Sequence, residues 1–120
     1  FGLAREALSE GMTMTSAVGN CVCMAPEVFN GGKYHSSADV YSYGMLLYQL
    51  FVNPADICQG YSPQVWASLA SQERRRPPVE PLLELGIPAL AELIQACWQH
   101  EPRARPSFRD IVDFLPTIFG

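Results

Sequence analysis

The pattern of apolar and polar positions predicts a mainly helical chain built around one central helix. Residues 38–52 are apolar on almost every side, which is typical of a helix enclosed by other elements. Ser36 or Ser37 is expected to cap this helix, with Asp39 in its first turn, where the helix dipole favours a carboxylate. The Asn-Pro pair at 53–54 is expected to end it.

Three amphipathic helices are predicted after the central one. Ser62 and Pro63 are typical of an N-cap followed by proline at the first helical position. Pro88 begins the second helix, and the Pro-Ser pair at 106–107 begins the third, which Pro116 is expected to end. Their expected apolar stripes are Val65, Trp66 and Leu69; Leu90, Leu93, Ile94, Cys97 and Trp98; and Phe108, Ile111, Val112 and Leu115.

The rest of the chain is predicted to be turns and loops. Residues 1–19 show neither a helical nor a strand period, so they are expected to form a long loop. Loops beyond about 12 to 15 residues are uncommon unless they are functional or disordered. Residues 25–32 are expected to form a short helical turn, and residues 77–86 a proline-rich connection. No segment alternates convincingly as a strand would, so the fold class is mainly α.

Composition excludes several classes of protein. Of the 120 residues, 48% are hydrophobic and 17% are charged, below the roughly 25% of an average domain. The net charge is -4 with only eight Lys and Arg, and the single basic run is Arg74–Arg76. A nucleic-acid or anionic-membrane binder would need a basic patch, so neither partner is expected. No signal-peptide pattern is visible, and no apolar run approaches the roughly 18 residues of a membrane span.

The cysteines and histidines do not predict a metal site. Cys21 and Cys23 form a C-x-C pair rather than the C-x-x-C of zinc and redox sites, and no second pair follows at a ligand spacing. His35 and His100 are far apart in the sequence. Buried or half-buried thiols in a reducing compartment are the expected state.

Four short motifs, in order along the chain, resemble a protein kinase catalytic domain. Phe1-Gly2 resembles the end of the magnesium-binding D-F-G motif, and Met24-Ala25-Pro26-Glu27 resembles the A-P-E motif. Residues 39–44 resemble the start of the family's central helix, and residues 97–111 resemble its closing C-W-x-x-x-P-x-x-R-P-S-F-x-x-I pattern. One such motif can arise by chance, whereas four in order are specific. Met before A-P-E and the Cys-Trp ending favour the tyrosine-kinase-like or tyrosine-kinase branches.

The resemblance implies a domain organisation. The chain is expected to be the C-terminal helical lobe portion of the two-lobed α+β protein kinase fold, with the N-terminal lobe and catalytic loop absent from it. Residues 1–27 would be the activation segment and residues 28–120 the helical lobe. If upstream segments normally cover the central helix, Tyr41, Tyr43, Leu47 and their neighbours are expected to expose part of their apolar surface, and the isolated chain to be aggregation-prone or molten.

The resemblance also implies roles for single residues. Glu27 and Arg105 would form a buried ion pair that anchors the activation segment, the alternative being two solvated surface charges. Asp39 would accept backbone hydrogen bonds from the catalytic loop, and Trp98 would pack in the core.

The candidates in the activation segment concern phosphorylation and substrate choice. Phosphate on a loop hydroxyl can order the loop against Arg side chains, although plain loop hydroxyls are the alternative for each residue. Asn20 stands where the family usually has Thr or Ser, and Cys23 where Tyr or Trp is usual, so substrate choice and activity could both differ. The phosphoacceptor candidates are Ser9, Thr13, Thr15 and Ser16, of which Thr15 and Ser16 are favoured, and the substrate-loop candidates are Gly19, Asn20 and Cys23.

The expected function follows from the resemblance. The parent protein would be a cytoplasmic kinase that uses ATP and Mg2+ to phosphorylate Ser or Thr of protein substrates. These 120 residues contain no Gly-rich phosphate loop, nucleotide Lys, catalytic-loop Asp or metal-binding D-F-G Asp, so the chain alone is expected to bind neither ATP nor Mg2+ and to be inactive. Its partners would be protein substrates and the missing N-terminal part of the domain. The alternatives are a pseudokinase that acts as a scaffold and, at low weight, an unrelated helical interaction domain.

Overall fold

The computed structural model describes residues 21–119 apart from residues 33, 55 and 56. This part of the chain contains helices and turns and no strand, which confirms the mainly α class. In chain order the elements are η1 (Cys21–Cys23), α3 (Pro26–Phe29), α4 (Ser36–Val52), α5 (Pro63–Gln72), α6 (Glu80–Leu83), α7 (Pro88–Cys97), η2 (Pro102–Ala104) and α8 (Phe108–Phe119).

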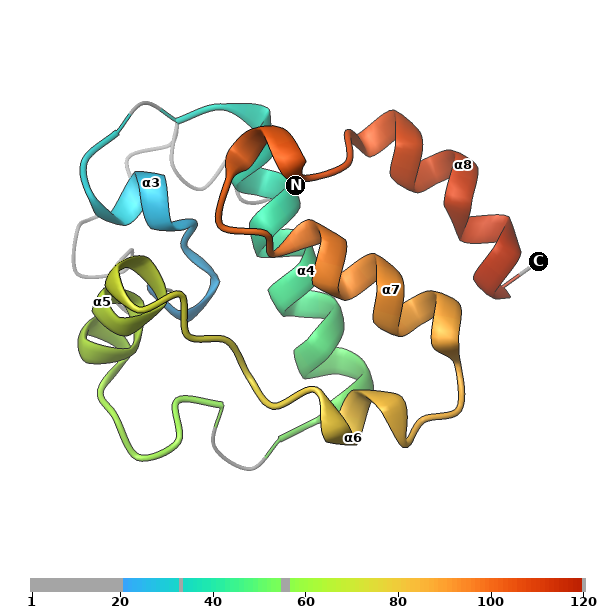
Figure 1. The fold of residues 1–120 in the computed structure, drawn as a ribbon, viewed down its shortest axis with the longest axis horizontal. Coiled ribbons are helices and arrows are strands. Elements are labelled where there is room, and N and C mark those ends of the chain that lie inside the picture. The colour runs from blue at the N-terminus through green and yellow to red at the C-terminus, as the bar shows by residue number, and fades with distance from the viewer. Residues whose placement is uncertain (1–20, 33, 55–56, 120) are drawn as a thin grey trace.

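Helix α4 is the central element, as its apolar sequence predicts. It runs through the middle of the fold with α7 alongside (Figure 1), and it also contacts η1, α6 and η2. Gly44 permits the close approach to α7, because a Cβ at this position would lie 2.6 Å from Cys97 Cβ and 3.2 Å from the Ile94 carbonyl oxygen.

The core is formed mainly by α4 and α7, with residues of α6 and α8. Tyr48 and Trp98 lie side by side, their ring centroids 5.6 Å apart, and the Tyr48 hydroxyl donates a hydrogen bond of 2.8 Å to the Pro78 carbonyl. The fully buried side chains of this core include Met45, Leu82, Leu90, Ile94 and Cys97.

Helix α5 packs on the other side of the fold, against η1 and α3. Ser62 is its N-cap and accepts a hydrogen bond from the Val65 backbone N–H, as predicted. Trp66 is 1% exposed, so α5 has a real buried face. Asn30, which ends α3, donates a side-chain hydrogen bond to Ser71 near the end of α5.

Three predicted boundaries were wrong. The N-cap of α4 is His35, in an extended conformation and without a side-chain capping bond, instead of Ser36 or Ser37. The proline-rich connection contains the short helix α6. Helix α8 continues through Pro116 instead of ending there. Proline has no backbone N–H, so the carbonyl of Val112, four positions earlier, loses its helical hydrogen bond. Val112 is 63% exposed, so water can donate to this carbonyl instead.

Some predicted apolar faces were also wrong. Val65 is 45% exposed and Val112 is 63% exposed, because α5 and α8 each bury a narrower stripe than the sequence indicated. In α4, Tyr41 and Leu47 were expected to expose apolar surface, but both are buried because they belong to the core cluster. Tyr43 is half-buried.

Among the neighbours of these residues, α4 does expose apolar surface, as predicted: Leu46 is 53% exposed and Leu50 is 70% exposed. Among the described helices, none is long and apolar enough to cross a membrane.

Candidate functional site

The structure brings Glu27 and Arg105 together, although they are 78 positions apart in the sequence. Glu27 lies in the four-residue helix α3, and Arg105 directly follows η2. The guanidinium donates two parallel hydrogen bonds to the carboxylate, from Nη1 to Oε2 at 2.8 Å and from Nη2 to Oε1 at 2.9 Å. The side chain of Arg105 has no exposed surface and that of Glu27 is 24% exposed, so solvent screens the pair only from the glutamate side.

The remaining donors of Arg105 bind three backbone carbonyls. Nη1 donates to Ser37 at 2.9 Å, Nε to Gln99 at 2.8 Å and Nη2 to His100 at 3.2 Å. With the two bonds to Glu27, all five N–H groups of the guanidinium have acceptors. Arg105 therefore ties α3 to the start of α4 and to the turn that follows α7.

The electrostatics of Glu27 reflect this contact. Burial by itself raises the pKa of the Glu27 carboxyl, but the hydrogen bonds and positive charge of Arg105 outweigh it, so the pKa lies below its ordinary value of 4.5. The carboxylate is therefore ionised at neutral pH and available to the guanidinium.

Two guanidinium groups lie over the ring of Tyr41. The Cζ atoms of Arg76 and Arg105 are each 5.1 Å from the centroid of its ring, within the range of cation–π interactions. Burial raises the pKa of the Tyr41 hydroxyl, and the two cations offset only part of that effect. The phenol thus stays neutral and serves as a packing surface for both arginines.

Arg76 is the part of this cluster that the sequence analysis missed. Its Nε donates to the Trp98 carbonyl at 2.8 Å, and its Nη1 donates to the carbonyls of Ala70 and Arg75 at 3.1 and 2.7 Å. Arg76 thereby joins the end of α5 to the end of α7. The only sequence signal was the basic run at residues 74–76 before two prolines. Such a run bears on nucleic-acid binding, and it did not predict that Arg76 would join two helices.

Cys23 attaches the chain just before α3 to the central helix. Its carbonyl accepts a 2.6 Å hydrogen bond from the Ser42 hydroxyl, and its sulfur accepts one of 3.3 Å from Gln49 Nε2. Burial raises the pKa of the Cys23 thiol, and the bond from Gln49 lowers it by less. A protonated, half-buried thiol is a packing group and not a nucleophile.

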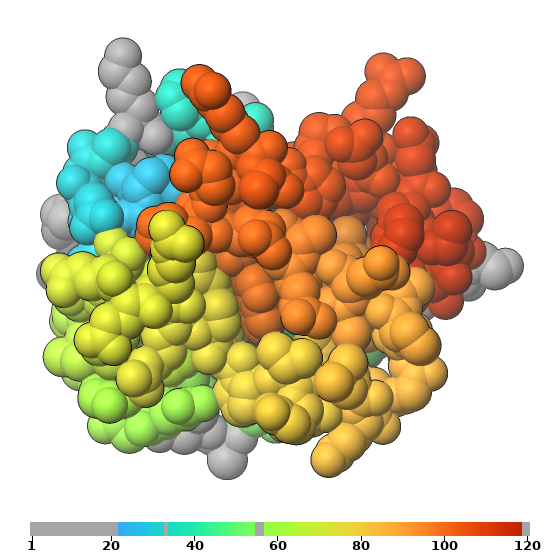
Figure 2. Space-filling view, in the orientation of Figure 1, coloured from blue at the N-terminus to red at the C-terminus, as the bar shows by residue number. Residues whose placement is uncertain are grey.

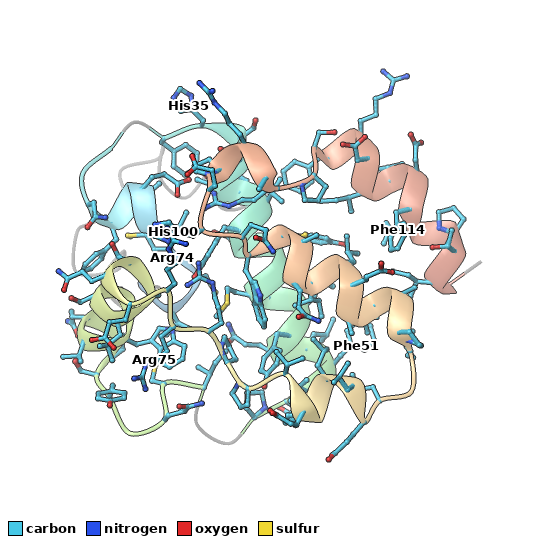
Figure 3. All side chains as sticks on the ribbon, in the orientation of Figure 1. His35, Phe51, Arg74, Arg75, His100 and Phe114 are labelled. Carbon is cyan, nitrogen blue, oxygen red and sulfur yellow. The ribbon has the colours of Figure 1, made fainter. Side chains whose placement is uncertain are left out.

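His100 lies close to the same arginines. Burial lowers the pKa of its imidazole, and the positive charges of Arg74, Arg76 and Arg105 lower it further. Its Nδ1 is buried and has no hydrogen-bond partner in the described part of the chain. His100 and Arg74 lie on the same side of the fold (Figure 3), so a proton on His100 would add to an already positive region.

The other predicted residues are placed as follows. Asp39 is 2% exposed and lies in the first turn of α4. Trp98 is 5% exposed and ends α7 within the core. The remaining predicted residues lie outside the part that the structure describes: Phe1, Gly2, Ser9, Thr13, Thr15, Ser16, Gly19 and Asn20.

Chemically, the described cluster can hold a segment of the chain in place. Between residues 21 and 119, leaving out the undescribed 33, 55 and 56, no group of three His, Cys, Asp or Glu is arranged to hold a metal ion. Burial raises the pKa of the Cys97 thiol to about 12, so this residue too is a packing group. What the site provides is an anchored turn beneath the segment that precedes Glu27.

Comparison with known proteins assigns the chain to a family. Residues 1–115 match the sequence model of the family described as protein tyrosine and serine/threonine kinase. The chain is 41% identical over 115 residues to a seven transmembrane domain-containing tyrosine-protein kinase of Dictyostelium discoideum, covering 96% of the chain and 16% of that protein. It is 38% identical over 118 residues to a dual specificity protein kinase of the same organism, covering 98% and 5%.

A third relative comes from a plant. The chain is 35% identical over 118 residues to a probable serine/threonine-protein kinase of Arabidopsis thaliana, covering 98% of the chain and 11% of that protein. The chain therefore spans well under a quarter of the length of each of these relatives.

Proposed function

Because the chain belongs to the protein tyrosine and serine/threonine kinase family, we propose that the polypeptide containing it transfers the γ-phosphoryl group of ATP to Ser or Thr of protein substrates. The observation that supports this most is the Glu27–Arg105 pair, which ties an Ala-Pro-Glu turn to the helical lobe with all five guanidinium donors used. Phosphoryl transfer depends on positioning and charge stabilisation, and a fixed turn at this place holds the segment that must position the substrate.

Within this proposal the chain contributes a scaffold and a substrate-facing segment. Residues 1–27 are the activation segment and residues 28–120 the helical lobe, with Gly19, Asn20 and Cys23 forming the substrate loop. ATP and Mg2+ bind to parts of the domain outside these 120 residues, which lack the nucleotide Lys and the catalytic Asp. Asp39, buried at the start of α4, is the proposed acceptor for backbone N–H groups of the catalytic loop.

Regulation and location are proposed on the same basis. Thr15 and Ser16 are the favoured phosphoacceptors, ahead of Ser9 and Thr13, because they lie nearer the end of the segment that Glu27 anchors. The catalytic domain acts in the cytoplasm, where it meets ATP and protein substrates.

A pseudokinase is the alternative function. Asn20 cannot supply the hydroxyl that the family usually has at this position, and Cys23 is bound to α4 through Ser42 and Gln49. Such a protein would keep the helical lobe as a binding scaffold and lose phosphoryl transfer.

The test is a transfer assay with the full-length polypeptide. Labelled ATP and Mg2+ are supplied with peptides in which Ser, Thr or Tyr is the single hydroxyl-bearing residue. The proposal expects Mg2+-dependent labelling of the Ser and Thr peptides and none when the 120-residue chain is assayed alone. Labelling of the Tyr peptide only would overturn the Ser/Thr assignment. No transfer to any peptide would favour the pseudokinase, and transfer by the 120-residue chain would refute its proposed inactivity.

A further inference from the structure

A groove lies between α7 and α8 and takes no part in the site around Arg105. Its volume is about 230 Å3, below the roughly 300 to 1,000 Å3 of pockets that enclose small-molecule ligands. Figure 2 shows this side of the molecule, where the orange residues of α7 meet the red residues of α8. The groove is lined by Glu92, Leu93, Ala96, Pro106, Asp110, Ile111 and Phe114.

The groove is apolar inside. Leu93 and Ile111 form buried surface, being 4% and 2% exposed. Ala96 and Phe114 are half-buried, and Phe114 comes from α8 (Figure 3). The short side chain of Ala96 leaves room beside α7. A space of this size and character suits one large aliphatic or aromatic side chain.

The charged groups of the lining are both acidic. Glu92 and Asp110 are exposed, and no basic residue lines the groove. One Asp110 oxygen accepts a 3.2 Å hydrogen bond from the Ser107 backbone N–H, as part of a capping box at the start of α8. Neither carboxylate forms a salt bridge within the described part of the chain. Both are therefore available to a cation presented next to the apolar space.

We propose that the α7–α8 groove binds a segment of a partner protein in which a large apolar side chain stands next to Lys or Arg. The apolar side chain fills the space beside Ala96 and Phe114, while the basic neighbours pair with Glu92 and Asp110. Charge complementarity selects this occupant, because an acidic segment would meet two carboxylates of the same sign. The proposal does not depend on phosphoryl transfer and holds equally for a pseudokinase.

Titration of the full-length polypeptide with labelled peptides tests the groove. The probe is Gly-Lys-Lys-Leu-Lys-Lys-Gly, compared with one peptide that has Glu for every Lys and another that has Gly for Leu. We expect saturable binding of the first peptide below about 1 mM, a range typical of weak contacts, and weaker binding of both others. The affinity should fall as salt is added, because the ion pairs are exposed.

Two variants locate the binding. Ala96→Trp fills the groove and should weaken binding at least 10-fold. Glu92→Lys should weaken it about 2- to 5-fold per lost exposed ion pair, and more if repulsion adds to the loss. Glu84→Lys is the matched control, since Glu84 is also exposed, follows the last residue of α6 and does not line the groove. Unchanged thermal melting shows that each variant folds.

The outcomes decide the matter as follows. The proposal is supported if Ala96→Trp and Glu92→Lys weaken the binding of the first peptide and Glu84→Lys does not. Equal binding of the acidic peptide, or equal loss in Glu84→Lys, would show nonspecific attraction and overturn it. Binding of decanoate that Ala96→Trp abolishes, with no binding of any peptide, would also overturn it, because the groove would then take an acyl chain.

Discussion

Arg105 uses every donor of its side chain, and lysine cannot reproduce that arrangement. A lysine ammonium has three donors around one nitrogen, whereas Arg105 reaches Glu27 with a planar fork and three carbonyls in other directions. We expect Arg105→Lys to lower the free energy of unfolding of the full-length polypeptide by about 3 kcal/mol, measured by urea denaturation.

Arg103→Lys is the matched control for this variant. Arg103 lies in η2, two positions before Arg105, and is exposed, so its replacement should change the free energy of unfolding by less than about 0.5 kcal/mol. Equal effects of the two variants would contradict the special role of Arg105.

The lowered pKa of Glu27 predicts an acid-sensitive contribution to stability. A carboxyl whose pKa is lower in the folded state stabilises that state fully above its unfolded pKa, and loses this effect as the pH falls through the folded value. With an ordinary value of 4.5, the contribution should be present at neutral pH and decline below about pH 4.5. Glu27→Gln should remove this component.

The measurement is the free energy of unfolding between pH 3 and 7 for the natural protein and the Gln variant. Their difference should be largest near neutral pH and shrink as the pH falls below 4.5. A difference that stays constant across this range would contradict the assignment, because the carboxylate charge would then contribute nothing.

At this scale the sequence predicts some contacts and not others, for a physical reason. Glu27 and Arg105 are 78 positions apart, so no helical or strand period relates them, and only the family resemblance paired them. The contacts of the Tyr41 ring with Arg76 and Arg105 had no such guide, because they depend on how α4, the connection after α5 and the turn after η2 pack together. Cation–π geometry of this kind is set by packing and leaves no local pattern.

Gly44 sets the distance between α4 and α7. A methyl group there would meet Cys97 Cβ at 2.6 Å and the Ile94 carbonyl at 3.2 Å, and neither neighbour is the free end of a flexible chain. We expect Gly44→Ala to lower the free energy of unfolding by about 1 to 3 kcal/mol, because overpacking outweighs the better helix propensity of alanine. Thermal unfolding of the full-length polypeptide measures the change.

Ser36→Ala serves as the control for Gly44→Ala. Ser36 lies in the same helix, α4, and is exposed, so its replacement reports on the helix without touching the α7 contact. A Gly44→Ala variant that is as stable as the natural protein would show that α7 can move away at no cost.

The helix caps give a second test at the level of elements. Ser62 accepts a hydrogen bond from Val65 N–H at the start of α5, whereas His35, the N-cap of α4, forms no side-chain capping bond. Ser62→Ala should therefore destabilise by about 1 kcal/mol, and Ser36→Ala by less than about 0.5 kcal/mol. Equal losses, measured by chemical denaturation, would contradict this assignment of the caps.

The same elements show what sequence patterns determine. Helices α4, α5, α7 and α8 could all be predicted from local signals. Helix α4 is a long run that is apolar on almost every side, and the other three combine an apolar period with a proline at or just before the start. The end of α8 was not, since Pro116 removes a bond at an exposed turn, where water can compensate. The buried width of α8 was also overestimated at Val112, because burial depends on the neighbouring helix and not on the stripe alone.

At the scale of the whole molecule, the central helix has one side that nothing in the described structure covers. Leu50 is 70% exposed and Leu46 is 53% exposed, while Met45 and Tyr48 on the same helix are almost fully buried. Neighbouring exposed leucines on a central helix are typical of a surface that another part of the protein covers. We infer that the rest of the kinase domain packs here.

This inference makes opposite predictions for the chain alone and for the full-length polypeptide. In the isolated chain, replacing Leu46 and Leu50 together by Gln should reduce aggregation, measured by light scattering, because less apolar surface meets water. In the full-length polypeptide the same double variant should lower stability by about 1.5 to 3 kcal/mol for each leucine that is covered there.

Val112→Gln is the control, since Val112 is 63% exposed but lies on α8. If Val112→Gln lowers the stability of the full-length polypeptide as much as the leucine variant does, the loss is not specific to the face of α4. If neither does, both leucines face solvent in the complete protein, and the inference is wrong.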